Sequence, residues 1–180
     1  MRTIISMKPE YLQSSLELVE QVFTDHESAE EGRTVRALVE EIRSKKYYLP
    51  ELELLMLEDG EPVGYVMFSR FHLGGKYDDR LLLLSPAAVR TDLQRQHICR
   101  DLIEYGFERA REMGYTAVIV EGNPANYRAR GFVTSSLHGI LPSENVHLPH
   151  PDCLMVKELV PGALEEIHGK VEYTDYKSLQ

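Results

Sequence analysis

The chain has 180 residues, of which 43% are hydrophobic and 27% are charged, and its formal net charge is −9. The composition is ordinary for a globular protein, and the negative charge argues against nucleic acid or an anionic membrane surface as a partner. No apolar run approaches the ~20 residues of a membrane span, the N-terminal stretch of residues 1–11 is too short and mixed for a signal peptide, and two cysteines give no disulfide framework. We therefore expect a cytoplasmic protein with one domain over residues 1–180.

The N-terminal quarter predicts one strand and two helices. Residues 3–7 form a short apolar strand candidate, and Pro9 suits the first turn of a helix. The predicted helix has an apolar stripe at helical spacing, which consists of Leu12, Leu16, Val19 and Phe23. Ser28 and Glu31 have the spacing of a capping box, so a second helix is expected from there to about Lys45. The sequence by itself favours two packing helices.

The following apolar runs predict strands. Residues 51–58 and 62–73 flank Asp59-Gly60, and an Asp-Gly pair between strands is a strong hairpin signal. After a glycine-rich turn, residues 77–84 predict a third antiparallel strand. Residues 133–141 and 153–159 predict two more strands near the C-terminus. A meander of strands that leads into a βαβ unit gives an α/β fold with a mixed sheet.

The stretch 81–132 has the order strand, polar turn, helix, strand, loop. The helix is expected from Ile98 to Met113, with Gly114 as its C-cap, and the loop carries Tyr127. In a βαβ unit the N-terminus of such a helix is suited to bind an anion.

Three arginines surround the start of this helix. Arg90, Arg95 and Arg100 lie where acidic side chains are usually favoured, and exposed amides together with arginines predict an anion site. The alternative is a solvated turn in which these arginines pair with nearby glutamates of a Glu-rich chain.

Several motifs in this stretch carry a family resemblance. The turn Gln94–Cys99 aligns with the pattern Gln/Arg-x-x-Gly-x-Gly/Ala, and Tyr127–Phe132 fits Tyr-x-x-x-Gly-Phe. Residues 122–125 and the tail 158–171 are similar to segments of the YhbS-like branch. The chain therefore resembles the GNAT superfamily of acyl-CoA-dependent N-acetyltransferases over nearly its whole length. The resemblance implies the GNAT fold, a mixed central β-sheet of about seven strands flanked by helices.

The resemblance also implies a site for acetyl-CoA as co-substrate. The cofactor would lie where the strand 81–89 splays from its neighbour, and Pro86, which has no N–H, independently predicts a break in pairing there. The residues implied to bind it are Ala88, Val89, Gln94, Arg95, Gln96, His97, Ile98, Cys99 and Asn123. Two of them depart from the family pattern, since His97 and Cys99 stand where the family has glycine and glycine or alanine.

Acyl transfer also needs an acid and a base. By resemblance, Tyr127 would protonate the departing thiolate as general acid; the alternative is a packed tyrosine whose hydroxyl bonds to backbone. Glu121, at the end of the strand 116–120, is a candidate general base, because ligands of α/β proteins usually bind at that sheet edge. The other candidates are Asp25, His26 and His138, and a water chain could replace all of them.

No metal is expected. The loop that contains His147, His150, Asp152 and Cys153 has metal-binding residue types, but it matches no standard zinc spacing, and we interpret it as a proline-stiffened loop.

The sequence leaves two functional hypotheses. One is an active N-acetyltransferase that acts on a small-molecule or peptide amine, and a cationic amine would be attracted if the excess negative charge lies near the site. The other is a non-catalytic acyl-CoA-binding or interaction protein with a degenerate pyrophosphate turn. A homodimer is compatible with either hypothesis.

Overall fold

The computed structural model describes all residues from Met1 to Gln180 and contains four α-helices and nine strands. The helices are α1 (Leu12–His26), α2 (Ala29–Arg43), α3 (Ile98–Glu112) and α4 (Pro124–Arg128). The strands are β1 (Arg2–Ser6), β2 (Glu53–Glu58), β3 (Glu61–Arg70), β4 (Leu81–Val89), β5 (Ala117–Glu121), β6 (Val133–Thr134), β7 (Ile140–Pro142), β8 (Leu154–Glu158) and β9 (Gly169–Val171). None of the helices has the length and hydrophobicity of a membrane-spanning segment.

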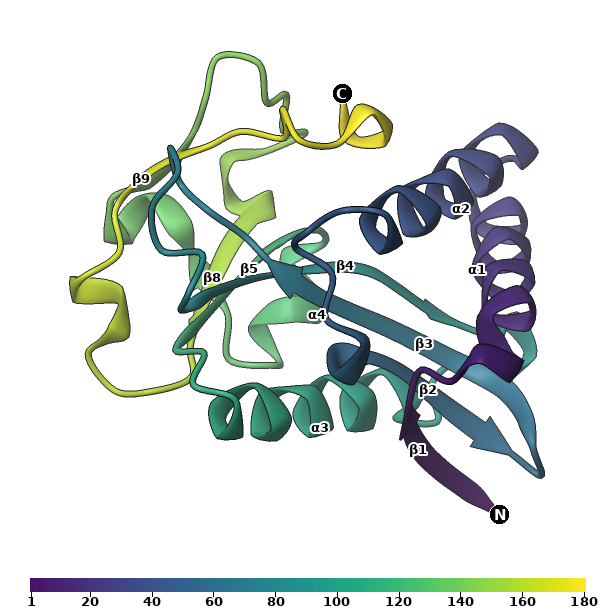
Figure 1. The fold of residues 1–180 in the computed structure, drawn as a ribbon. Coiled ribbons are helices and arrows are strands. Elements are labelled where there is room, and N and C mark those ends of the chain that lie inside the picture. Colours follow the sequence, from purple (N-terminus) through teal and green to yellow (C-terminus); the bar gives the residue numbers. More distant parts are fainter.

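Seven of the strands form one mixed sheet in the order β1-β2-β3-β4-β5-β8-β6, and β7 pairs with β9 in a separate parallel ribbon. Within the large sheet only β4 and β5 are parallel. Helices α1 and α2 cover one face and α3 covers the other, so the sheet is the middle of three layers (Figure 1). The predicted α/β fold with a mixed sheet of about seven strands is confirmed.

The strand sequences place a hydrophobic core on each face of the sheet. In β2, Leu54 and Met56 pack in the core that contains α3, whereas Leu55 and Leu57 pack in the core of α1 and α2. Successive side chains of a strand point to opposite faces, so a continuous apolar run is what a strand covered on both sides requires. The Asp59-Gly60 turn that joins β2 to β3 has φ angles of 51° and 85°, as a tight hairpin demands.

The predicted helix ends agree closely with the structure. The Ser28 hydroxyl accepts a hydrogen bond from the Glu31 N–H at 3.0 Å and caps α2. Helix α3 begins at Ile98, and Gly114 follows its end with a φ of +93°. The predicted apolar stripe of α1 is wrong at its first residue, because Leu12 is exposed and the buried face of the helix centres on Leu16, Val19 and Val22.

Three expected elements are corrected. Residues 77–80 are a turn, in which the Arg80 and Leu81 amides donate to the Tyr77 carbonyl, so β4 starts only at Leu81. Residues 133–141 are not one strand, because a 3-10 turn and Gly139 (φ +73°) separate β6 from β7. Tyr127 lies on the short helix α4 and not in a loop.

A buried carboxylate joins the helical layer to the sheet. Glu53 of β2 is fully buried and accepts hydrogen bonds from Arg43 of α2 at 2.8 Å and from Tyr65 of β3 at 2.5 Å. Tyr48 donates to the same carboxylate, and Arg43 also donates to Ser15 of α1. Because every partner is hydrogen-bonded, this cluster fixes α1 and α2 against the sheet.

Candidate active site

The site begins where β4 and β5 separate. Their parallel pairing covers only Leu81–Leu83 opposite Ala117–Ile119. On the other edge of β4 the register with β3 shifts, so that Ser85 and Pro86 together face the single residue Met67. The shift opposite β3 confirms the break in pairing predicted at Pro86. The separation from β5 leaves the other edge of β4 uncovered by any strand after Leu83.

The main chain of Val89 faces this open edge. The Arg90 N–H donates to Val63 of β3 at 2.9 Å, and adjacent residues of a strand present their amides to opposite edges, so Val89 turns away from β3. Its carbonyl accepts a hydrogen bond from Gln94 Nε2 at 2.6 Å. Gln94 therefore secures the turn to the strand, and its side chain is engaged within the protein.

Three adjoining cavities form a groove along this edge. The acidic cavity, about 480 Å³, lies between α1, α2, β4 and α4 and includes Glu27, Glu31 and Glu121. The middle cavity, about 440 Å³, shares Phe23, Glu27, Asn123 and Tyr127 with it. The basic cavity, about 280 Å³, shares Val89, Gln94, Cys99 and Asn126 with the middle one. The groove thus runs from the N-terminus of α3 to the space between α1 and α2.

The basic cavity is lined by the predicted turn. Arg95 and His97 both have a φ of 64°, in the left-handed region that favours glycine, and both side chains are exposed. Ile98 is buried in the core, and Cys99 and Arg95 line the cavity beside it. Gln96 accepts a hydrogen bond from Arg2 of β1, which ties the turn to the edge of the sheet.

The arginines of this region divide into two groups. Arg90 pairs with Asp92 at 2.7 Å and Arg100 with Asp101 at 3.1 Å, so these two arginines are paired as in the solvated-turn alternative, but with aspartates and not with glutamates. Arg95 forms no ion pair. Arg130, which sequence reasoning missed, also lines the cavity without an ion pair, and its buried Nε has no hydrogen-bond partner. Its place inside the motif Tyr127–Phe132 was the signal that could have identified it.

Tyr127 stands at the junction of the middle and acidic cavities. Asn123 caps α4 by accepting the Ala125 N–H at 3.0 Å, and the Tyr127 ring packs edge-on against Phe132 with centroids 5.6 Å apart. A Cβ on Gly122 would lie 2.5 Å from this ring, so only glycine lets the ring take its position.

The Tyr127 hydroxyl makes no hydrogen bond within the chain, contrary to what a packing role with a bond to backbone would give. Burial raises the pKa of Tyr127 well above its ordinary value, the nearby Cys99 adds to this, and Arg130 opposes it. The hydroxyl therefore stays protonated at neutral pH and is available as a proton donor.

The candidate bases are placed differently. Glu121 borders the acidic cavity and accepts a hydrogen bond from the Tyr173 hydroxyl at 2.9 Å. His26 borders the middle cavity. Asp25 lies outside the groove, where it accepts a hydrogen bond from Thr91 at 2.7 Å, and His138 borders none of the three cavities. Geometry thus leaves Glu121 and His26 as side chains that could receive a proton in the groove.

The loop before β8 uses its polar residues locally. His150 Nδ1 accepts the Asp152 N–H at 3.1 Å, and Asp152 pairs with Arg128 of α4 at 3.2 Å. No three His, Cys, Asp or Glu side chains of the chain lie close enough together to hold a metal ion.

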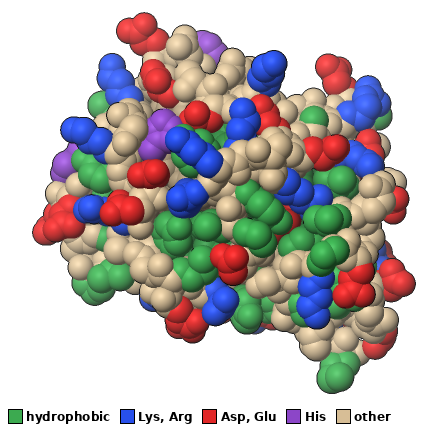
Figure 2. All heavy atoms as spheres, in the orientation of Figure 1, with side chains coloured by type: hydrophobic (Ala, Val, Ile, Leu, Met, Phe, Trp, Pro, Cys, Tyr) green, Lys and Arg blue, Asp and Glu red, His purple; other side chains and the backbone are tan.

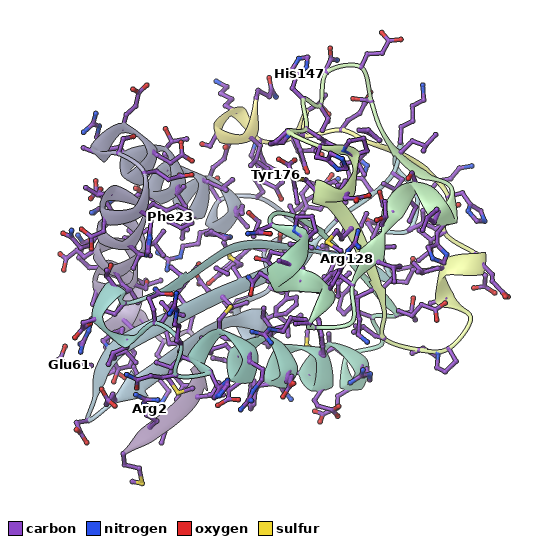
Figure 3. All side chains as sticks on the ribbon, turned by 180° about the vertical axis from the view of Figure 1, so that it is seen from behind. Arg2, Phe23, Glu61, Arg128, His147 and Tyr176 are labelled. Carbon is purple, nitrogen blue, oxygen red and sulfur yellow. The ribbon has the colours of Figure 1, made fainter.

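The C-terminal segment supplies a wall that sequence reasoning did not foresee. Ser178 and Leu179 line the acidic cavity, and the Lys177 and Ser178 amides donate to the Glu41 carboxylate of α2 at 2.9 and 3.1 Å. Figure 3 shows Phe23 on α1 and Arg128 on α4 on opposite sides of the centre of the sheet, with Tyr176 of this segment at its upper edge. Because the segment has no hydrophobic periodicity, its position was not readable from the sequence.

Comparison with known proteins places this geometry in context. Residues 16–138 match the model of the acetyltransferase (GNAT) family. The chain is 30% identical over 120 residues to YhbS of Escherichia coli K12, which is described as an uncharacterised N-acetyltransferase. The aligned residues cover 66% of this chain and 69% of that protein.

Solved structures are also similar. The E. coli YhbS protein in complex with CoA superposes with a TM-score of 0.82 at 26% identity, covering 96% of this chain and 89% of the other. A GNAT family acetyltransferase from Brucella melitensis in complex with acetyl-CoA has a TM-score of 0.74 at 22% identity, covering 100% and 99%. At that identity the second likeness concerns the fold alone.

Proposed function

Because the chain belongs to the acetyltransferase (GNAT) family, we propose that it transfers the acetyl group of acetyl-CoA directly to an amine. The observation that carries this proposal is the position of Tyr127, whose hydroxyl has no hydrogen-bond partner in the protein, at the junction of the middle and acidic cavities. It would separate a cofactor side, formed by the basic and middle cavities, from an acceptor side, formed by the acidic cavity.

The residues of the cofactor side fit CoA. The N-terminus of α3, Arg95, His97 and the unpaired Arg130 suit its phosphates, and the open edge of β4 suits the amide-bearing pantetheine arm. The similar E. coli YhbS structure is described as a complex with CoA, which supports the same ligand here. Acetyl-CoA supplies the activated thioester.

The protein groups then have defined tasks. The Val89 N–H at the open edge would stabilise negative charge on the acyl oxygen, and Tyr127 would protonate the thiolate as it departs. Glu121 would accept the proton of the amine, directly or through water, because it borders the acceptor side and its carboxylate is already oriented by Tyr173. Ala88 and Asn123 border the middle cavity; because the main chain of Ala88 faces Tyr65 of β3, its side chain, and not its amide as the resemblance implied, would contact the cofactor.

A second candidate is a non-catalytic acyl-CoA-binding protein. His97 and Cys99 support it, because both replace small residues in the turn. The left-handed backbone of His97, however, is the one that glycine would also adopt, so the turn keeps its shape. The unpaired Tyr127 hydroxyl has no use in a binding protein and favours the enzyme.

Tyr127→Phe tests the proposal. CoA release should fall by about 10²–10⁴ in kcat, because a general acid is lost, whereas calorimetric CoA affinity should change less than about twofold. Tyr105→Phe, a partly exposed tyrosine of α3, is the matched control and should leave both quantities unchanged. CoA binding without turnover by the parent protein against a broad amine panel would favour the binding-protein alternative, and equal turnover by Tyr127→Phe would refute the role of Tyr127.

A further inference from the structure

The acidic cavity has negative charges that the protein does not neutralise. Glu27, Glu31 and Glu121 line it, none of them forms an ion pair, and no lysine or arginine lines the cavity. Figure 2 shows acidic and basic side chains interspersed over the face in view, so the net charge of −9 is not a single patch there. Three uncompensated carboxylates around one cavity are therefore a local feature with a local electrostatic effect.

The carboxylates also affect one another. The pKa of Glu31 is raised by burial and by repulsion from Glu27 and Glu30, which means that its charged form lacks a favourable partner in the protein. A cation that entered the cavity would supply that partner, and its attraction would be stronger than in bulk water because the walls are partly buried.

The walls between the carboxylates are apolar. The side chains that provide this surface are Phe23, Val35, Leu38, Leu84 and Leu179. Glu27 and Glu31 come from the α1–α2 side and Glu121 comes from the end of β5, so acidic groups lie at both sides of a hydrocarbon-lined space. Tyr127, whose hydroxyl has no hydrogen-bond partner in the protein, also lines this space, so a reacting group would lie beside it.

The C-terminal segment limits what can enter. Ser178 and Leu179 form part of the wall, and the hydrogen bonds to Glu41 hold that segment against α2. A cavity of about 480 Å³ with this wall suits a compact ligand better than a residue on the surface of a folded protein.

We propose that the acceptor is a small aliphatic amine with a second cationic group, which Glu27 and Glu31 bind while the reacting amine lies between Glu121 and Tyr127. This assignment rests on the proposed acetyl transfer. The carboxylates would hold the distal ammonium, and the apolar walls would cover the methylene chain between the two nitrogens.

Titration calorimetry of the full chain saturated with CoA tests this independently of turnover. Putrescine carries two ammonium groups, whereas aminobutanol has the same chain with one, so putrescine should bind at least about tenfold more tightly. Glu31→Gln should remove most of that difference. Glu30→Gln, on the same helical turn but outside the cavity, is the matched control and should keep it, and Glu27→Gln gives a second test should Glu31→Gln prove unstable.

Equal affinity for the two amines, or no binding of putrescine to the CoA complex, would overturn the inference. A lysyl peptide that bound as tightly as putrescine would overturn the restriction to small amines. These results are distinguishable from failure of the proposed function, which would appear as absence of CoA binding or of acetyl transfer to any amine.

Discussion

Replacing His97 by glycine separates the backbone of the phosphate turn from its side chain. His97 has a φ of 64° and a ψ of 16°, and it begins α3 without a side-chain capping bond. A left-handed conformation costs an L-residue about 1–2 kcal/mol, whereas glycine adopts it freely but loses about 0.5–1 kcal/mol more backbone entropy on folding. The variant should therefore be more stable than the parent by about 0–1.5 kcal/mol, or up to about 5 °C in Tm.

CoA affinity should change in the opposite sense. Because the histidine already holds the glycine-like backbone, only the imidazole distinguishes the two turns, and it is exposed in the basic cavity with no partner. A charge-assisted hydrogen bond from it to a phosphate contributes about 1.5–3 kcal/mol, or more than about tenfold in Kd. We therefore expect His97→Gly to weaken CoA binding by about tenfold or more.

Calorimetric titrations with CoA from about pH 5.5 to 8, together with thermal melts, measure both effects. His97→Ala is the matched control, since it removes the imidazole and retains the backbone strain, so it should lose affinity without the gain in Tm. Tighter CoA binding by the glycine variant at every pH would show that the imidazole obstructs the phosphate, and would refute this reasoning.

Four other changes have definite outcomes. Arg130→Met keeps the aliphatic stem but should raise the Kd for CoA about tenfold or more, as measured by calorimetry. Arg128→Met is the control, because Arg128 pairs with Asp152, and it should leave the Kd unchanged. An equal loss of affinity in both variants would contradict a specific role of Arg130. Because burial raises the pKa of Tyr127, kcat should not fall as the pH rises to about 10. A decline of kcat centred near pH 9 that Tyr127→Phe abolishes would be evidence against a buried acid. Burial raises the pKa of Glu41, but hydrogen bonds from Lys177 and Ser178 outweigh it and lower the pKa below 4.5. The stability that Glu41 provides is thus present above that pH and lost below it, so the Tm deficit of Glu41→Gln should be larger at pH 7 than at about pH 3.5, and a constant deficit would exclude this linkage. Glu53→Ala leaves the Arg43 guanidinium without its buried partner and should lower the free energy of unfolding, measured with denaturant, by about 3–5 kcal/mol. Glu58→Ala removes only the surface pair with Arg2 and should lower it by less than about 1 kcal/mol. Similar losses in both variants would mean that the buried network contributes little to stability.

The sequence predicts best the elements whose local chemistry and tertiary packing agree. The Asp59-Gly60 hairpin, the Ser28 cap and the ends of α3 were foreseen because each depends on a few adjacent residues. Residues 133–141 were misassigned because their apolar content suits a strand, while Gly139 diverts the chain into a different sheet, and strand pairing is a non-local choice.

The candidate site was foreseen in part for the same reason. The arginines around the start of α3 pointed to the turn, and the family resemblance of the same contiguous stretch pointed to Tyr127; the structure brings both to one groove. The positions of Arg130 and Leu179 in the groove depend on contacts between segments that are distant in the sequence, and hydrophobic periodicity does not predict such contacts. Whether the arginines bind an anion or pair within the chain was left open by the sequence, and the partners of Arg90 and Arg100 are aspartates, where glutamates were named.

The wall formed by Ser178 and Leu179 has a consequence for how acceptor preference could diverge. Most of the cofactor side is encoded within residues 87–130, with Phe23 and His26 added by α1, whereas this wall is encoded about fifty residues later and is held by one carboxylate, Glu41. Substitutions in the C-terminal segment can therefore change the shape of the acidic cavity while the cofactor side of the groove stays intact. Among homologues, this modular arrangement would let new amine specificities arise through drift of a short peripheral segment, and a chimera that exchanges only residues 173–180 would transplant part of that specificity.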